Sequence, residues 1–141
     1  MENFYSESGT ITFEAMDRRK LGRRGEWVAL ALLLLKGYRP RHRNWRGAGG
    51  ELDLVVERRG EIVFVEVKAR SSDLLGGAGG AVDAHKKRIL ARTSSAYLSR
   101  HGLWDRPCRF DIVTVEKMDG FPFWKIRHYP NAFSPDLGRQ M

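Results

Sequence analysis

The chain has 141 residues, the length of one domain, and it can bury a hydrophobic core without disulfides. Its single cysteine excludes an intramolecular disulfide, and no Cys/His cluster has the spacing of a zinc site. The 25 Lys and Arg against 17 Asp and Glu give a formal net charge of +8, which favours a polyanionic partner, most often nucleic acid. The longest apolar run, Val28–Leu35, is too short to span a bilayer, and no signal peptide is evident. We therefore expect a cytoplasmic protein with no membrane partner.

The first part of the chain is expected to form a helix behind an N-terminal extension. Residues 1–16 show no sustained period, and we interpret them as an extension, disordered or adding an edge strand, ahead of a single domain over 17–141. From the candidate N-cap Asp17 to Gly37 the pattern is helical. The residues expected on its buried face are Leu21, Val28, Leu32 and Leu35.

Three strands are expected next, over Tyr38–Trp45, Leu52–Glu57 and Ile62–Ala69. The first is basic and contains a proline, which indicates an edge strand. The other two flank the sequence RRGE, which predicts a hairpin with Gly60 in the turn. This turn would place residues 51–55 opposite residues 64–68.

The second half of the chain completes an α/β pattern. The glycine-rich segment Ser71–Gly80 is expected to be a mobile loop, and a second helix is expected over Val82–Arg100. Two further strands are expected over Arg109–Val115 and Phe123–His128, with a turn at Asp119–Gly120 between them. The inward residues expected in the second helix are Ile89, Ala96 and Tyr97. The order predicts an α/β fold with a mixed sheet flanked by helices.

Charged residues stand in the central strands, where apolar residues are expected. Glu66 and Lys68 share one face of a strand that is apolar on both faces, and burying them costs free energy unless they are paired or bind an ion. The hairpin register brings Asp53 toward both. Two carboxylates suit Mg²⁺, which activates phosphodiesters, and a nearby lysine can orient water or stabilise developing charge. The alternative is a strand end at the sheet's rim, with Glu66 and Lys68 solvated or ion-paired.

These residues also carry a resemblance to a known family. Asp53, a step of 13 residues to Glu66, and then Glu66-Val67-Lys68 resemble the PD-(D/E)XK nuclease signature, with Leu52 where the signature has proline. The wider sequence resembles the YraN family of small bacterial proteins, which are similar to archaeal Holliday-junction resolvases. The matching segments are GRRGEWVA (22–29), GYRPRHRNWR (37–46), GELDLVV (50–56), VFVEVKAR (63–70) and RFDIVTV (109–115). The resemblance implies a restriction-endonuclease-like fold with an αβββαβ core.

The resemblance also implies roles for single residues. Asp53 and Glu66 would be ligands of Mg²⁺ or Mn²⁺, with the Val67 carbonyl as a third ligand. Lys68 would be the catalytic lysine. Glu26 matches the helical glutamate of the resolvases, which joins the metal site, while its alternative is a solvated helix residue.

Two further carboxylates are harder to assign. Glu51 is interpreted either as a residue that supports the metal ligands or as a strand-end residue. Asp111 matches a recurrent family position, and an ion pair with a nearby arginine is an equal alternative.

Basic residues cluster around the predicted site. For several of them the alternative is a position on the solvated surface without any contact with nucleic acid. Arg39, Arg41 and Arg43 share one strand face by alternation, as a row that follows phosphates would. Trp45 is expected either to stack on an exposed base or to cover the core. The full predicted nucleic-acid surface comprises Arg23, Arg24, Arg39, Arg41, Arg43, Arg46, Lys86 and Lys87.

We therefore expect a Mg²⁺- or Mn²⁺-dependent endonuclease that binds DNA rather than RNA, branched or structured, and hydrolyses phosphodiester bonds. The alternatives are a non-catalytic nucleic-acid-binding module with the same fold and a protein-interaction adaptor. Cutting two strands symmetrically requires two sites, so a homodimer is expected if branched DNA is the substrate. The candidate interface residues, with core packing as their alternative, are Phe121, Phe123, Trp124 and Tyr129.

Overall fold

The structure, a computed structural model, describes residues 13–70, 84–117 and 124–137. Its elements are α1 (Phe13–Leu35), β1 (Arg39–Gly47), β2 (Gly50–Arg58), β3 (Glu61–Arg70), α2 (Ala84–Arg100), β4 (Cys108–Lys117) and β5 (Trp124–Phe133). Helix α1 thus begins four residues before the predicted N-cap. The predicted loop and the predicted Asp119–Gly120 turn lie outside the described residues.

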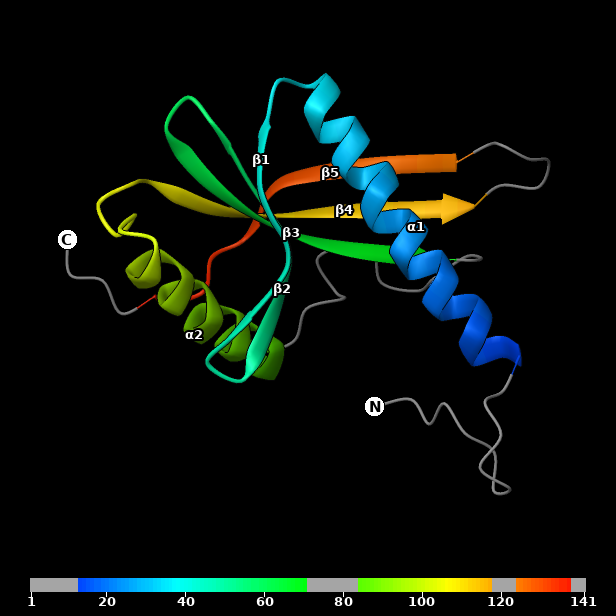
Figure 1. Cartoon of the computed structure of the whole chain (residues 1–141), viewed down its shortest axis with the longest axis horizontal. Helices are drawn as coiled ribbons and strands as arrows, with labels where there is room; N and C mark the ends of the chain where they lie inside the picture. Colours follow the sequence, from blue (N-terminus) through cyan, green and yellow to red (C-terminus); the bar gives the residue numbers. More distant parts are fainter. Residues whose placement is uncertain (1–12, 71–83, 118–123, 138–141) are drawn as a thin grey trace.

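The five strands form one mixed sheet in the order β1-β2-β3-β4-β5. Neighbouring strands are antiparallel except β3 and β4, which are parallel and joined through α2. Helix α1 lies across one face of the sheet and α2 lies on the other (Figure 1). The predicted α/β fold with a restriction-endonuclease-like core is therefore confirmed.

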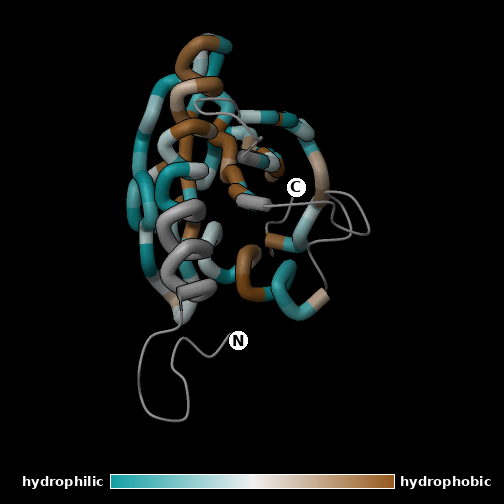
Figure 2. The backbone as a smooth tube through the Cα atoms, turned by 90° about the vertical axis from the view of Figure 1, so that its right-hand side faces the viewer, coloured by the Kyte–Doolittle hydropathy of each residue, from teal (hydrophilic) through white to brown (hydrophobic). Residues whose placement is uncertain are grey.

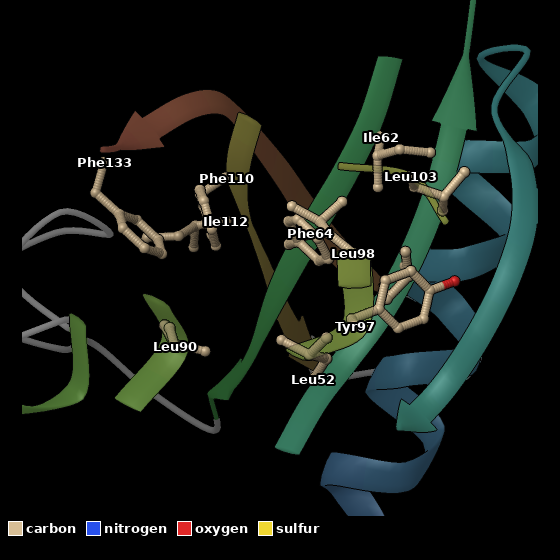
Figure 3. Close-up of a cluster of buried hydrophobic side chains, with 11 residues drawn as sticks. Leu52, Ile62, Phe64, Leu90, Tyr97, Leu98, Leu103, Phe110, Ile112 and Phe133 are labelled. Carbon is tan, nitrogen blue, oxygen red and sulfur yellow. The ribbon is translucent and has the colours of Figure 1, made fainter. Parts of the chain in front are cut away.

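Alternation along β3 gives the sheet two apolar faces, as predicted. Val63 and Val65 pack under α1, whereas Ile62 and Phe64 pack under α2. Figure 3 shows the cluster on the α2 side, where aromatic and aliphatic side chains from the sheet meet those of α2. Both faces of β3 are buried, so a charged residue in this strand has to find its partners inside the protein.

The buried face of α1 differs from the predicted one. Gly25, Ala29 and Leu33 are buried at a spacing of four, whereas Leu35 is 87 % exposed. The C-terminal turns of α1 are rich in hydrophobic residues (Figure 2), so the apolar run reaches every side of the helix and does not determine its rotation. The small residues Gly25 and Ala29 let the helix approach the sheet closely.

Two tight hairpins set the strand register. Arg59 and Gly60 have φ of 53° and 80°, and Ala48 and Gly49 have φ of 51° and 79°. Positive φ at both central residues is the type I′ turn, whose twist matches that of antiparallel strands. The hairpin between β2 and β3 pairs Leu54 with Val65 and Val55 with Phe64, in the predicted register. The ladder ends there, so the predicted pairing does not extend to residues 51–53 and 66–68.

Helix α2 is held against the start of β2 by a close backbone approach. A Cβ atom on Gly50 would lie 2.1 Å from Thr93 Oγ1, so this position accommodates only glycine without displacing the helix. Tyr97 is fully buried, as predicted, while Ile89 and Ala96 are only partly buried. The remaining buried residues of α2 are Leu90, Ala91, Thr93, Ser94 and Leu98.

Candidate functional site

The ladder between β2 and β3 opens at Asp53. Its last pair is Leu54 with Val65, and beyond it the Asp53 carboxylate accepts a hydrogen bond of 2.9 Å from the Val67 N–H. Leu52 packs in the same α2-side cluster as Val55, so the regular alternation of β2 is interrupted at Asp53. The Asp53 side chain thus lies in the gap between two strands.

The same hydrogen bond indicates where the Val67 carbonyl points. In a strand, the N–H and C=O of one residue point toward the same neighbouring strand. Because the Val67 N–H faces Asp53, we expect its carbonyl oxygen to face the gap as well. This orientation is the one that a third oxygen ligand would need.

Glu66 lies beside this gap with two lysines on one of its oxygens. Its side chain is 9 % exposed, and Oε1 lies 2.5 Å from Lys86 Nζ and 3.4 Å from Lys68 Nζ. Lys86 comes from the first turn of α2. In the alternative of a strand end at the sheet's rim, Glu66 would be either solvated or ion-paired. The structure shows an ion pair, and the side chain of Glu66 is too buried to be solvated. The sequence had assigned Lys86 only to the nucleic-acid surface.

The environment of Asp53 disfavours its ionised form. Burial, followed by the charge of Glu66, raises the pKa of Asp53 to about 8, although the Val67 N–H works in the opposite direction. The burial has a visible source, because a cavity of about 10 Å³ next to Asp53 and Glu66 is otherwise lined by apolar side chains. Five of these are labelled in Figure 3: Leu52, Phe64, Leu90, Phe110 and Phe133.

The two lysines respond differently to this environment. Burial, and then the neighbouring Lys86, lowers the pKa of Lys68. Burial is the largest single effect on Lys86 and would lower its pKa, but the charge and hydrogen bond of Glu66, with smaller contributions from Lys68 and Asp53, together raise that pKa. Lys86 therefore holds the ion pair with Glu66, and Lys68 is the ammonium that gives up its proton more readily.

Glu26 approaches the same gap from α1. Its side chain is 15 % exposed and lies 3.6 Å from Arg43 Nη1, so the alternative of a solvated helix residue is wrong. Burial raises the pKa of Glu26, and the charge of Glu26 in turn contributes to the raised pKa of Asp53. Glu51 is more exposed and pairs with Arg46 at 3.3 Å, which keeps it at the strand end.

The donor set can be compared with what divalent cations require. Within the described ranges, no three or more His, Cys, Asp or Glu side chains converge as a metal cluster. Mg²⁺ does not need such a cluster, because one or two carboxylates with water and substrate phosphate oxygens complete its shell. Asp53 and Glu66 would provide the two carboxylates, and the Val67 carbonyl would provide one further oxygen ligand. A cation there would also relieve the repulsion that raises the pKa of Asp53.

The predicted row of arginines on β1 is wrong. A β-bulge between Pro40 and His42 interrupts the alternation. Arg41 donates to the Tyr97 hydroxyl and to Glu57, both at 3.1 Å, on the α2 side. Arg43 instead lies against α1, so these two arginines serve opposite faces of the sheet.

The other predicted basic residues differ in exposure. Arg23, Arg24 and Arg39 are exposed, and the Arg46 side chain is 80 % exposed. Lys87 is partly buried on α2. The exposed arginines remain candidates for phosphate contacts.

The exposed tryptophan next to β1 is Trp27 rather than Trp45. Trp45 packs edge-on against Tyr97, with ring centroids 5.2 Å apart. It therefore covers the core, which was the second of its two expected roles. Trp27, which the sequence reading did not single out, is 56 % exposed and has the Arg43 guanidinium 4.4 Å from its ring centroid. A correct helix rotation would have identified it.

Asp111 belongs to a separate network on the α1 side of the sheet. Fully buried, it accepts hydrogen bonds from Arg109 Nε at 2.9 Å, His128 Nε2 at 2.7 Å and the Asn131 N–H at 2.9 Å. The ion-pair alternative for Asp111 is therefore what the structure contains. Its strand partner is Val65, so it points to the face opposite Glu66.

Two of the four predicted interface residues, Phe121 and Phe123, lie outside the described residues. Trp124 and Tyr129 are partly buried against the two core clusters, as their packing alternative predicted. None of the helices in the described part of the chain is both long and apolar enough to cross a membrane.

Comparison with known proteins agrees with the motifs and the fold. The model of "Uncharacterised protein family UPF0102" matches residues 25–115. The chain belongs to this family. It is the YraN family, a PD-(D/E)XK nuclease-like group, so the family expected from the motifs is confirmed.

Relatives from distant bacteria match most of the chain. The UPF0102 protein of Symbiobacterium thermophilum is 48 % identical over 98 residues, which cover 70 % of this chain and 83 % of the relative. That of Moorella thermoacetica is 46 % identical over 100 residues, covering 71 % and 83 %. That of Bacteroides thetaiotaomicron is 41 % identical over 121 residues, covering 86 % and 98 %. The match to the last of these extends across nearly the whole relative.

Proposed function

We propose that this UPF0102 family protein is a divalent-metal-dependent nuclease that hydrolyses phosphodiester bonds in DNA, preferentially branched or structured DNA. The observation that carries the proposal is the gap between β2 and β3. There, the charge of Glu66 raises the pKa of the buried Asp53, and a cation bound between the two carboxylates would remove this repulsion. A purely structural role would favour apolar residues at these positions, because buried carboxylates cost free energy.

Each residue of the gap has a role in this proposal. Asp53, Glu66 and the Val67 carbonyl hold Mg²⁺ or Mn²⁺, and Glu26 supports the site from α1. A bound divalent cation supplies polarisation of the phosphate and a lower pKa of the attacking water. Lys68, whose pKa is lowered, orients that water or stabilises charge on the transition state.

The substrate phosphates meet basic residues around the gap. Lys86 and Lys87 lie in the first turn of α2, and the N-terminus of a helix also attracts anions. Exposed arginines on α1 and β1 extend this surface. Such contacts orient the DNA backbone without reading its sequence, so recognition by shape or branching is favoured.

The test incubates purified protein with single-stranded, duplex, flapped and four-way-junction DNA, and with RNA, in Mn²⁺ or in EDTA. We expect cleavage of at least one DNA substrate in Mn²⁺ and none in EDTA. Asp53→Ala should abolish metal binding and cleavage together. Lys68→Met should keep metal and DNA binding while the rate falls by roughly 10²–10³.

The matched control is Glu51→Ala, which removes a more exposed carboxylate two residues from Asp53. It should leave both metal binding and cleavage close to those of the parent. DNA binding without cleavage of any substrate would support the binding-module alternative instead. If Asp53→Ala binds Mn²⁺ as the parent does, Asp53 is not a ligand and the proposed site is wrong.

A further inference from the structure

An exposed aromatic ring borders the candidate site. Among the described residues, Trp27 is one of only three large hydrophobic side chains that are exposed, with Leu34 and Leu35. Trp27 is 56 % exposed even though the Arg43 guanidinium lies over its ring. The exposed part is therefore ring surface that the guanidinium does not cover.

Contacts connect this ring to the carboxylates of the site. The guanidinium over Trp27 also lies 3.6 Å from Glu26, and Arg43 is the β1 partner of Leu54, the residue that follows Asp53. The pairing with Glu26 fixes one end of Arg43, which in turn supports one face of the indole. Trp27 is thus a preorganised flat surface at the α1 edge of the gap.

The chemistry of this surface favours a nucleobase. Aromatic side chains stack on bases with little sequence preference, and a guanidinium on the opposite ring face adds a cation–π contribution. In a duplex both faces of each internal base are already stacked on neighbouring bases. The ring can therefore stack only on an unpaired, terminal or extruded base.

Charge favours nucleic acid over a protein helix as the occupant. Arg23 and Arg24 are exposed on the turn of α1 that precedes Trp27, and they suit the phosphates on either side of a stacked base. The exposed Leu34 and Leu35 lie about two turns further along the helix. A protein that docked on α1 would use these leucines as well, whereas a single stacked base would not.

We propose that Trp27, backed by Arg43, stacks an unpaired base of the substrate next to the candidate site. The substrate class then comprises DNA with a single-stranded segment at the cleavage point, such as a flap, a gap or a junction branch. This inference rests on the proposed function, because it names the substrate of the same site.

The experiment measures binding in EDTA, so that it is independent of cleavage. Labelled single-stranded DNA, flapped DNA and an internal duplex whose ends are blocked by a bulky cap on the terminal base pairs are titrated with the parent, Trp27→Ala and the control Leu35→Ala, which removes a more exposed apolar side chain from the same helix. Trp27→Ala should lose roughly 5- to 150-fold in affinity for the first two substrates, the range that corresponds to one stacked base. Affinity for the end-capped duplex, which offers no free base face, should change less than about twofold, and Leu35→Ala should bind all three substrates as the parent does.

A fluorescence measurement covers the case in which Trp27→Ala does not fold. Single-stranded DNA should quench part of the tryptophan emission of the parent, and Trp27→Phe should lose that part of the quenching. Phenylalanine preserves an aromatic ring, so this variant should also keep most of the affinity. An oligonucleotide series with one abasic position should lose affinity for the parent but not for Trp27→Ala.

Several outcomes overturn the inference. Equal losses for duplex and single-stranded DNA mean that Trp27 does not stack a base. Equal losses in Trp27→Ala and Leu35→Ala indicate a general effect on α1 rather than stacking on a base. If the parent binds DNA and Trp27→Ala binds it with the same affinity, this inference alone is refuted. If the parent binds no nucleic acid, the inference and the proposed function are both refuted.

Discussion

Replacing Asp53 with asparagine is expected to make the metal-free protein more stable. Burial and the neighbouring Glu66 raise the pKa of Asp53 from 3.8 to about 8, so at pH 7 the folded protein takes up a proton that the unfolded chain lacks. Each pH unit between 3.8 and 7 costs about 1.36 kcal/mol, or about 4 kcal/mol altogether. Asparagine keeps the acceptor for Val67 N–H and removes the titration, so we expect a gain of about 1 to 4 kcal/mol.

The pH dependence gives the sign of the effect. Because the folded pKa is raised, the contribution of Asp53 to stability is fully present below pH 3.8 and is lost as pH rises through about 8. The advantage of Asp53→Asn should therefore be near zero around pH 4 and grow until about pH 8. Urea denaturation in EDTA, at several pH values on the parent and the variant, measures it.

Two further measurements decide whether this reasoning holds. Mn²⁺ at 100 times its dissociation constant should stabilise the parent by about 2.7 kcal/mol and Asp53→Asn by much less. Glu51→Gln, at a more exposed position, should change stability by less than about 0.5 kcal/mol. A pH-independent difference, or a variant less stable than the parent at pH 8, would mean that Asp53 is an ordinary ionised partner of the lysines.

Further predictions concern Lys86, Asp111, the binding of DNA and the oligomeric state. Lys86→Gln should bind Mn²⁺ more tightly and DNA more weakly in calorimetric titrations, because it removes the ammonium that pairs with Glu66. Asp111→Ala should cost about 3–5 kcal/mol in urea denaturation, since Arg109 and His128 lose a buried carboxylate. Although burial would raise the pKa of Asp111, hydrogen bonds from His128 and Arg109 hold it below 3.8, so the destabilisation by Asp111→Asn should shrink as pH falls below about 4. DNA affinity should fall with salt at a slope of about −0.9 per phosphate contact, and an affinity that ignores salt would contradict the nucleic-acid partner. Sedimentation with junction DNA should show a dimer, and a strict monomer at high concentration would contradict cleavage of branched DNA by paired sites.

Local signals in the sequence were sufficient to predict the centre of the site. The RRGE turn determines the register of β2 and β3, and the alternation of β3 places Glu66 and Lys68 on one face. With that register, Asp53 had to lie near both. These predictions needed only the two-residue alternation of side chains in a strand, the residue types of the turn and the family motif.

Features that depend on how elements dock were not predictable in the same way. The rotation of α1 was missed because its apolar run has no polar side, and Trp27 was missed as a consequence. The β-bulge at Arg41 was not predicted, because the adjacent Pro40 is as compatible with a regular edge strand as with a bulge, yet it places Arg41 and Arg43 on opposite faces of the sheet. Lys86 meets Glu66 only because α2 packs where Gly50 allows it to.

The pairing of Lys86 with Glu66 has a consequence for how the proposed ligands would bind. A divalent cation and the Lys86 ammonium compete for the same carboxylate oxygen, so in the absence of DNA the ion pair opposes metal binding. A DNA phosphate near the start of α2 would attract Lys86 away from Glu66 and leave the carboxylate to the cation. Because such coupling is reciprocal, Mn²⁺ should strengthen DNA binding by the same factor by which DNA strengthens Mn²⁺ binding. The cooperativity should disappear in Lys86→Gln, because no ammonium then links the two ligands.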